Sequence, residues 1–174
     1  MRARAAARPD KDRTFLKEAA SGGMLEVRLG QLVQQSATDD SVKAFGARMV
    51  SDHSQANAEL TSLAGSKGIT IPTALSKQDQ AVYDKLSKMT GAALDRAYMA
   101  DMVKDHIKDV AEFRKEAKSA TDPDVRAFAS KTLPILEHHL QMAKMIDGRL
   151  KGHAQGHTME KPPAGQQGQS KSSG

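Results

Sequence analysis

Two segments of this chain carry nearly the same sequence, 83 residues apart. Residues 36–46 read SATDDSVKAFG and residues 119–129 read SATDPDVRAFA, with seven of eleven positions identical. The same offset aligns residues 13–18 (RTFLKE) with residues 96–101 (RAYMAD). Each copy has the pattern of a helix, a short turn and a second helix, so the repeat predicts two helical hairpins related by an approximate two-fold axis.

The composition favours a helical protein and excludes several chemistries. The chain has 174 residues, of which only 3% are aromatic, and it has no cysteine. Disulfides, thiolate metal ligands and cysteine nucleophiles are therefore excluded. The net charge of +5 is spread along the chain without the aromatic residues typical of single-strand binders, so we predict no nucleic-acid partner. The sequence lacks a run of about 18 apolar residues, so we also predict no transmembrane segment.

Four long amphipathic segments and one shorter segment predict the helices. Apolar residues recur at spacings of three and four in the long segments, which is the period of a helix with one buried face. The connection 66–90 has a helical second half, and it is long enough to cross a bundle and make the second and third long helices parallel. We therefore predict an all-α, ferritin-like four-helix bundle from two duplicated hairpins, with a short extra helix in the crossover. The long helices are predicted over 12–36, 39–65, 91–119 and 122–150.

The ends of the helices and of the bundle have their own signals. Thr38 or Asp39, and Thr121 or Asp122, are predicted to cap the second helix of each hairpin. The bundle is predicted over 13–151, between a flexible segment 1–12 and a disordered tail 152–174 that is rich in Gly, Pro, Gln and Ser. The first twelve residues lack the apolar run of a signal peptide, but a processed or mis-assigned start would look the same.

The apolar stripes carry polar residues that a helical core does not normally hold. A buried charge or unpaired imidazole is costly, so these side chains must hydrogen-bond, bind an ion or reach water. Counting along the helices places Glu26, His53, His106 and Asp109 within about one turn of a common level, on the order of 5 Å. His139 lies about one further turn away, so it completes this group or supports it from outside.

Imidazole and carboxylate groups that converge in a bundle predict a metal site. We predict one transition-metal ion, zinc, copper or iron, bound by His53 and His106 with Glu26 or Asp109, and with His139 as a further ligand or a supporting residue. Met49, Met102 and Met142 lie near the histidines along the helices, and thioethers suit Cu(I), although methionine is also an ordinary core residue. The alternative is a hydrogen-bonded polar layer that sets the register between helices.

A second repeated motif surrounds two of these histidines. MVSDH at 49–53 recurs as MVKDH at 102–106. Asp52 and Asp105 precede the histidines and face about 100° away from them. We therefore interpret these two aspartates as surface or supporting residues rather than ligands.

Several separate blocks give the chain a family resemblance. GGMLEVRLGQL, VKAFGARMVSDH, GITIPTAL, LDRAYMADMVKDH and VRAFASKTLPILEHHLQMAK occur along about residues 13–150. Together they resemble a bacterial ferritin-like family of domains of unknown function whose members are often labelled as outer membrane proteins. The resemblance implies a helical bundle exported to the periplasm or cell envelope, with no established reaction. His53, His106 and His139 match the family's histidine-bearing motifs, and Glu26 lies in its GGM-x-E block.

The chain departs from the di-iron enzymes of ferritin-like fold. Those enzymes use a Glu-x-x-His motif on two helices, but Val50 and Leu136 stand three residues before His53 and His139. Ferroxidase or oxygenase chemistry is therefore not our prediction. We expect a small metal-binding or stress-associated envelope protein, with an envelope partner or a homodimer left open. The alternatives are a purely structural or interaction bundle and a metal-dependent redox enzyme.

Overall fold

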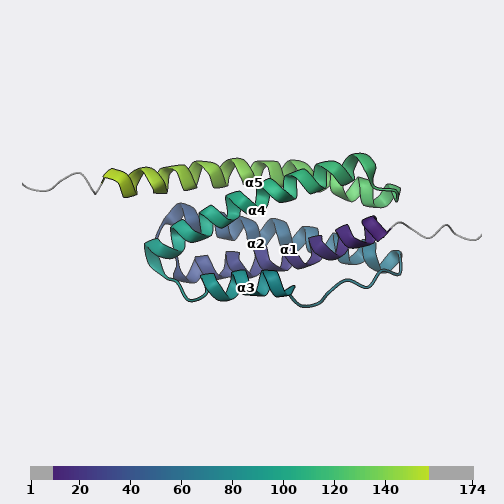
Figure 1. Ribbon diagram of the computed structural model, residues 1–174, viewed down its shortest axis with the longest axis horizontal. Coiled ribbons are helices and arrows are strands. Elements are labelled where there is room, and N and C mark those ends of the chain that lie inside the picture. Colours follow the sequence, from purple (N-terminus) through teal and green to yellow (C-terminus); the bar gives the residue numbers. More distant parts are fainter. Residues whose placement is uncertain (1–9, 157–174) are drawn as a thin grey trace, which may run out of the picture.

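The computed structural model describes residues 10–156, which form five α-helices (Figure 1). The prediction of an all-helical bundle is confirmed: two long hairpins, α1 with α2 and α4 with α5, pack together, and a short helix lies in the connection between them. The helices are α1 (Asp10–Ser36), α2 (Asp40–Ser66), α3 (Lys77–Leu86), α4 (Gly91–Ser119) and α5 (Pro123–Gly156).

The long connection determines how the hairpins are oriented. In Figure 1, α2 and α4 both run from left to right, whereas α1, α3 and α5 run from right to left. The chain thus returns along the bundle through α3 before α4 begins. Besides the pairing within each hairpin, α2 packs on α5 and α1 packs on α4, and α3 contacts both α1 and α4. One flank of the bundle, between α1 and α4, is therefore covered by the crossover.

The predicted caps account for the starts of two helices. Asp39 is the N-cap of α2 and accepts hydrogen bonds from the backbone N–H groups of Ser41 and Val42. Asp122 precedes α5, and its Oδ1 accepts from the backbone N–H of Asp124 at 2.9 Å. Each aspartate occupies the same position in its copy of the repeat, which explains why both hairpins turn at the same place.

The first hairpin is held by an unusually close approach of its helices. A Cβ atom added to Gly30 would lie 2.6 Å from the carbonyl oxygen of Gly46, and one added to Gly46 would lie 2.4 Å from Cγ2 of Val33. Only glycine allows the two backbones to come this close. The contact fixes α1 against α2 and so positions the residues that follow on α2.

The bounds of the outer helices differ from the predicted ones. The first helix begins at Asp10 rather than at 12, and α5 continues to Gly156 rather than ending at 150. The rest of the predicted flexible segment 1–12 and of the predicted tail 152–174 lies outside the described residues. Within residues 10–156, no helix has the length and apolar character needed to cross a membrane.

Candidate metal centre

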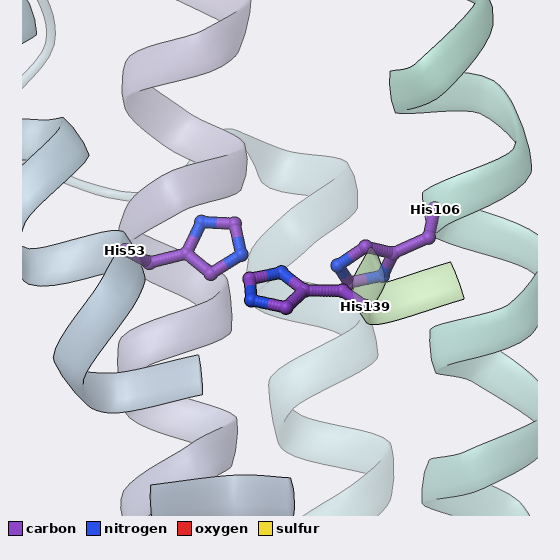
Figure 2. Close-up of side chains that lie close together, drawn as sticks. All are labelled: His53, His106 and His139. Carbon is purple, nitrogen blue, oxygen red and sulfur yellow. The ribbon is translucent and has the colours of Figure 1, made fainter. Parts of the chain in front are cut away.

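Three histidines from three helices meet inside the bundle. His53 lies on α2, His106 on α4 and His139 on α5, and their rings face one another across the space between these helices (Figure 2). The ring centroids are 5.9 Å apart for His53 and His106, and 5.4 Å apart for each of the two pairs that include His139. One nitrogen of each ring lies within 4.8 Å of a nitrogen of both others. Sequence reasoning placed His139 a turn away, but the structure brings it into the group.

In two of these rings, a hydrogen bond occupies one nitrogen and leaves the other nitrogen free. The His106 Nδ1–H donates to the carbonyl oxygen of Met102 at 3.0 Å, and the His139 Nε2–H donates to Oδ2 of Asp52 at 2.8 Å. A carbonyl and a carboxylate are acceptors, so the proton of each neutral ring sits on the donating nitrogen and the other nitrogen carries a lone pair. Among the described residues, Nε2 of His53, Nε2 of His106 and Nδ1 of His139 are buried without a hydrogen-bond partner.

The surroundings keep the three rings uncharged. Burial, aided by His106 and His139, lowers the pKa of His53 to about 3, and burial lowers the pKa of His106 to about 4. Burial also lowers the pKa of His139, against the opposing effect of Asp52. At neutral pH all three imidazoles are therefore neutral, which is the form that binds a metal ion.

An apolar wall isolates the histidines on one side and a cavity reaches them on the other. The ring of Phe45 lies 6.5 Å from both His106 and His139, which are fully buried. His53 is 7% exposed and lines a cavity of about 660 Å³ that opens to the surface. Six acidic side chains and three lysines also line this cavity, so its lining is net negative. A small cation therefore has a favourable route to His53.

The carboxylates predicted with the histidines form a neighbouring group instead. Carboxylate oxygens of Glu26, Asp105 and Asp109 lie within 4.8 Å of one another. The closest link between the groups joins Glu26 Oε1 to Nδ1 of His106, at 3.9 Å. That nitrogen is the one bonded to Met102, so Glu26 faces a different edge of the ring from the free Nε2. The role of Glu26 and Asp109 as metal ligands stays a prediction.

Burial raises the pKa of all three carboxyl groups, and neighbouring carboxylates add to the effect at Glu26 and Asp109. Burial, together with Asp105 and Asp109, raises the pKa of Glu26 well above its usual range. Burial and Asp105 raise the pKa of Asp109 to about 8, and burial raises that of Asp105. With a pKa of about 8, Asp109 holds its proton at pH 7 unless a cation replaces it.

Sequence reasoning set aside two residues that the structure places beside these groups. The sequence predicts that Asp105 is a surface or supporting residue; in the structure it is half-buried, with a carboxylate oxygen within 4.8 Å of those of Glu26 and Asp109. Asp52 holds His139 in orientation, as expected for a supporting residue. The repeated MVSDH and MVKDH motifs are the signal that both aspartates share a position relative to a core histidine.

The repeat explains where the cavity lies. At an offset of 83 residues, each histidine corresponds to a residue without an imidazole, and these three residues line the cavity. The cavity therefore lies at the place that the approximate two-fold axis relates to the histidine cluster. The corresponding pairs are His106 with Gly23, His139 with Ala56, and His53 with Leu136.

Comparisons with known proteins identify a family and a fold. A family described as a domain of unknown function, DUF4142, matches residues 1–146. No curated protein matches the chain. Among solved structures, the crystal structure of a DUF305 fragment from Deinococcus radiodurans is similar, with a TM-score of 0.71 and 13% sequence identity over 82% of this chain and 98% of that one. At this identity the likeness concerns the fold alone.

Proposed function

This chain belongs to the DUF4142 family of domains of unknown function, and we propose that it binds one transition-metal ion through His53, His106 and His139. The observation that carries the proposal is the set of three neutral, buried ring nitrogens that lack partners and point into one space. Leaving each nitrogen unsatisfied costs about 1–3 kcal/mol. A single ion satisfies all three at once.

The donor set favours a borderline transition metal. Three imidazoles suit zinc, copper and iron, and they leave one position that a ligand from solution can fill. Zinc–nitrogen bonds are about 2.1 Å long, so nitrogens within 4.8 Å of one another bind one ion after small ring rotations. Because Asp52 anchors His139 and the Met102 carbonyl anchors His106, two of the rings are already oriented.

The biological role we propose follows the family resemblance. We propose a metal-binding protein of the bacterial cell envelope, in a stress or homeostasis role rather than an enzymatic one. The chain lacks the Glu-x-x-His motifs of di-iron enzymes, which argues against ferroxidase chemistry. The net negative cavity that reaches His53 supports uptake of a cation from solution.

Metal titration of chelator-treated protein tests the proposal. We expect calorimetry and elemental analysis to give one Zn²⁺ or Cu²⁺ per chain that is lost in His53→Leu and in His139→Ala. These replacements install the residue types found at the repeat-equivalent positions 136 and 56, so the folds of these variants should persist. His138→Ala is the matched control, because His138 is exposed and adjacent to His139. Uptake that is unchanged in His53→Leu would overturn the proposal.

The purely structural alternative makes a different prediction. If the histidines only set packing between helices, the melting temperature is the same with chelator and with excess Zn²⁺. An ion that binds the native state alone raises the melting temperature as its concentration increases. Thermal melts at two Zn²⁺ concentrations therefore separate the two interpretations.

A further inference from the structure

We infer that Glu26, Asp105 and Asp109 form a second cation site, distinct from the histidine site, for a divalent ion that prefers oxygen ligands. Their carboxylate oxygens lie within 4.8 Å of one another. Two helices, α1 and α4, supply the three side chains, so the group is built on rigid elements rather than on a loop. Carboxylate oxygens are the ligands preferred by Mn²⁺, Ca²⁺ and Mg²⁺.

Glu26 gives an independent reason to assign a ligand to this group. Its side chain is fully buried, and neither carboxylate oxygen has a hydrogen-bond partner among the described residues outside this group, whose Asp105 carboxyl is close enough to share a proton with it. Over the same residues, no lysine or arginine forms an ion pair with Glu26, Asp105 or Asp109. A buried carboxyl without a partner is costly, and a cation held between the three groups removes that cost.

The repeat explains why the carboxylates converge. Glu26 and Asp109 are equivalent residues at the offset of 83, and they lie on antiparallel helices that pack on each other. Equivalent residues near an approximate two-fold axis necessarily lie close to each other. Asp105 precedes Asp109 by four residues, one helical turn, and so adds a third oxygen donor on the same face of α4.

The second site and the histidine site are separate but adjacent. Glu26 Oε1 is 3.9 Å from Nδ1 of His106, which donates to Met102 and is not the nitrogen that His106 offers to the first ion. Asp105 and Asp109 line the open cavity, whereas Glu26 is fully buried and is not among its lining residues. Solvent in the cavity can therefore supply the water ligands that hard divalent cations retain.

Electron paramagnetic resonance with Mn²⁺ as the probe tests this site in Zn²⁺-saturated protein. We expect one Mn²⁺ per chain to be bound, and this uptake to be lost in Glu26→Gln and in Asp109→Asn. Both replacements keep the size of the side chain and resemble its uncharged, protonated form, so folding should be retained while a carboxylate ligand is lost. Asp101→Asn is the matched control, since Asp101 lies on the same helix and lines the same cavity but is outside the group of three.

The outcomes for the two sites are distinguishable. His53→Leu should lose the Zn²⁺ ion and keep Mn²⁺ uptake, whereas Glu26→Gln should lose Mn²⁺ and keep Zn²⁺. An absence of stoichiometric Mn²⁺ in both wild type and His53→Leu overturns the second site without affecting the first. Mn²⁺ uptake that is unchanged in Glu26→Gln also overturns it, because the ion is then bound elsewhere.

Discussion

Asp12 and Asp95 are equivalent residues of the two halves, and each binds the turn of the opposite hairpin. The two oxygens of Asp95 accept from the backbone N–H groups of Thr38 and Asp39, at 3.0 and 3.1 Å. Those of Asp12 accept from Thr121 and Asp122, at 3.1 and 2.7 Å. Both aspartates are 3% exposed. The hairpins therefore exchange the same contact at opposite ends of the bundle.

Removing either carboxylate should destabilise the protein to a similar extent. Asp12→Ala and Asp95→Ala each leave two backbone N–H groups without their charged acceptor, so we expect a loss of about 2 kcal/mol from the free energy of unfolding. Because the sites are at opposite ends, the double variant should show additive losses. Urea denaturation measures the free energy of unfolding of the two single variants and of the double variant. A much smaller loss at one site would contradict the conclusion that the two aspartates make equivalent contacts.

Replacing one interior histidine should stabilise the metal-free protein while abolishing metal uptake. His53→Leu removes an unpartnered Nε2 from the core and adds apolar surface of similar size. We expect a gain of about 1–2 kcal/mol in the free energy of unfolding in the presence of chelator. With Zn²⁺ in excess, the wild type should become the more stable of the two. Thermal melts with chelator and with excess Zn²⁺ check that the order of stability of the two proteins reverses.

Acid should destabilise the metal-free protein through the histidines. The unfolded chain protonates its histidines near pH 6.5, whereas folded His53 and His106 do so only at about 3 and 4. Stability is therefore lost as the pH falls from about 6.5 towards 4, by about 1.4 kcal/mol per pH unit for each histidine. Urea midpoints between pH 8 and 4 should show a shallower acid slope in His53→Leu than in wild type.

Alkali should act on the carboxylate group in the opposite direction. The folded protein holds the Asp109 proton up to about pH 8, whereas the unfolded chain releases it near 3.8. The stability linked to that proton is complete below about pH 4 and is lost as the pH rises through 8. Asp109→Asn should therefore be more stable than metal-free wild type at pH 8, and the difference should shrink at pH 5. Equal stability at both pH values would contradict the assigned shift.

Weakening the hydrogen bond that orients His139 should weaken the metal site without destroying it. Asp52→Asn replaces the carboxylate that accepts the His139 Nε2–H by a weaker, uncharged acceptor. We expect Zn²⁺ affinity to fall about 10- to 100-fold with one site retained. Calorimetry of Asp52→Asn and of an Arg48→Ala control checks this, since Arg48 contacts the same carboxylate from the exposed side.

The helices were predictable because local signals agreed with the periodicity. Asp39 and Asp122 cap their helices as their positions after the repeated Ser-Ala-Thr segment predict. Gly68 adopts a φ of 65° just beyond α2, the conformation that favours glycine at the end of a helix. By contrast, the last residues of α5 carry glycines and few apolar residues, so nothing in that segment predicts that the helix continues to 156.

Counting residues along the helices predicts the level of His139 incorrectly because it considers backbone positions only. Side chains on a helix tilt towards its N-terminus. The helices α4 and α5 run in opposite directions (Figure 1). This general tilt therefore moves the rings of His106 and His139 towards each other along the bundle. A difference of about one turn between backbones is closed in this way.

The half-burial of Asp105 was not predictable from the sequence for a different reason. Its direction, about 100° from His106, points to the flank between α1 and α4, and sequence reasoning treated that flank as surface. The crossover helix α3 packs over this flank, and Ser21 on α1 donates a hydrogen bond to Asp79 on α3. Which side of the bundle a crossover covers depends on three-dimensional packing, and no local pattern in the sequence encodes it.

Both groups of ligands are divided between the hairpins: His53 and Glu26 come from the first, and the other four side chains come from the second. A chain caught with separately formed hairpins, such as a folding intermediate, would consequently present incomplete coordination and retain neither ion. Ion uptake during refolding would then mark the moment at which the two halves dock.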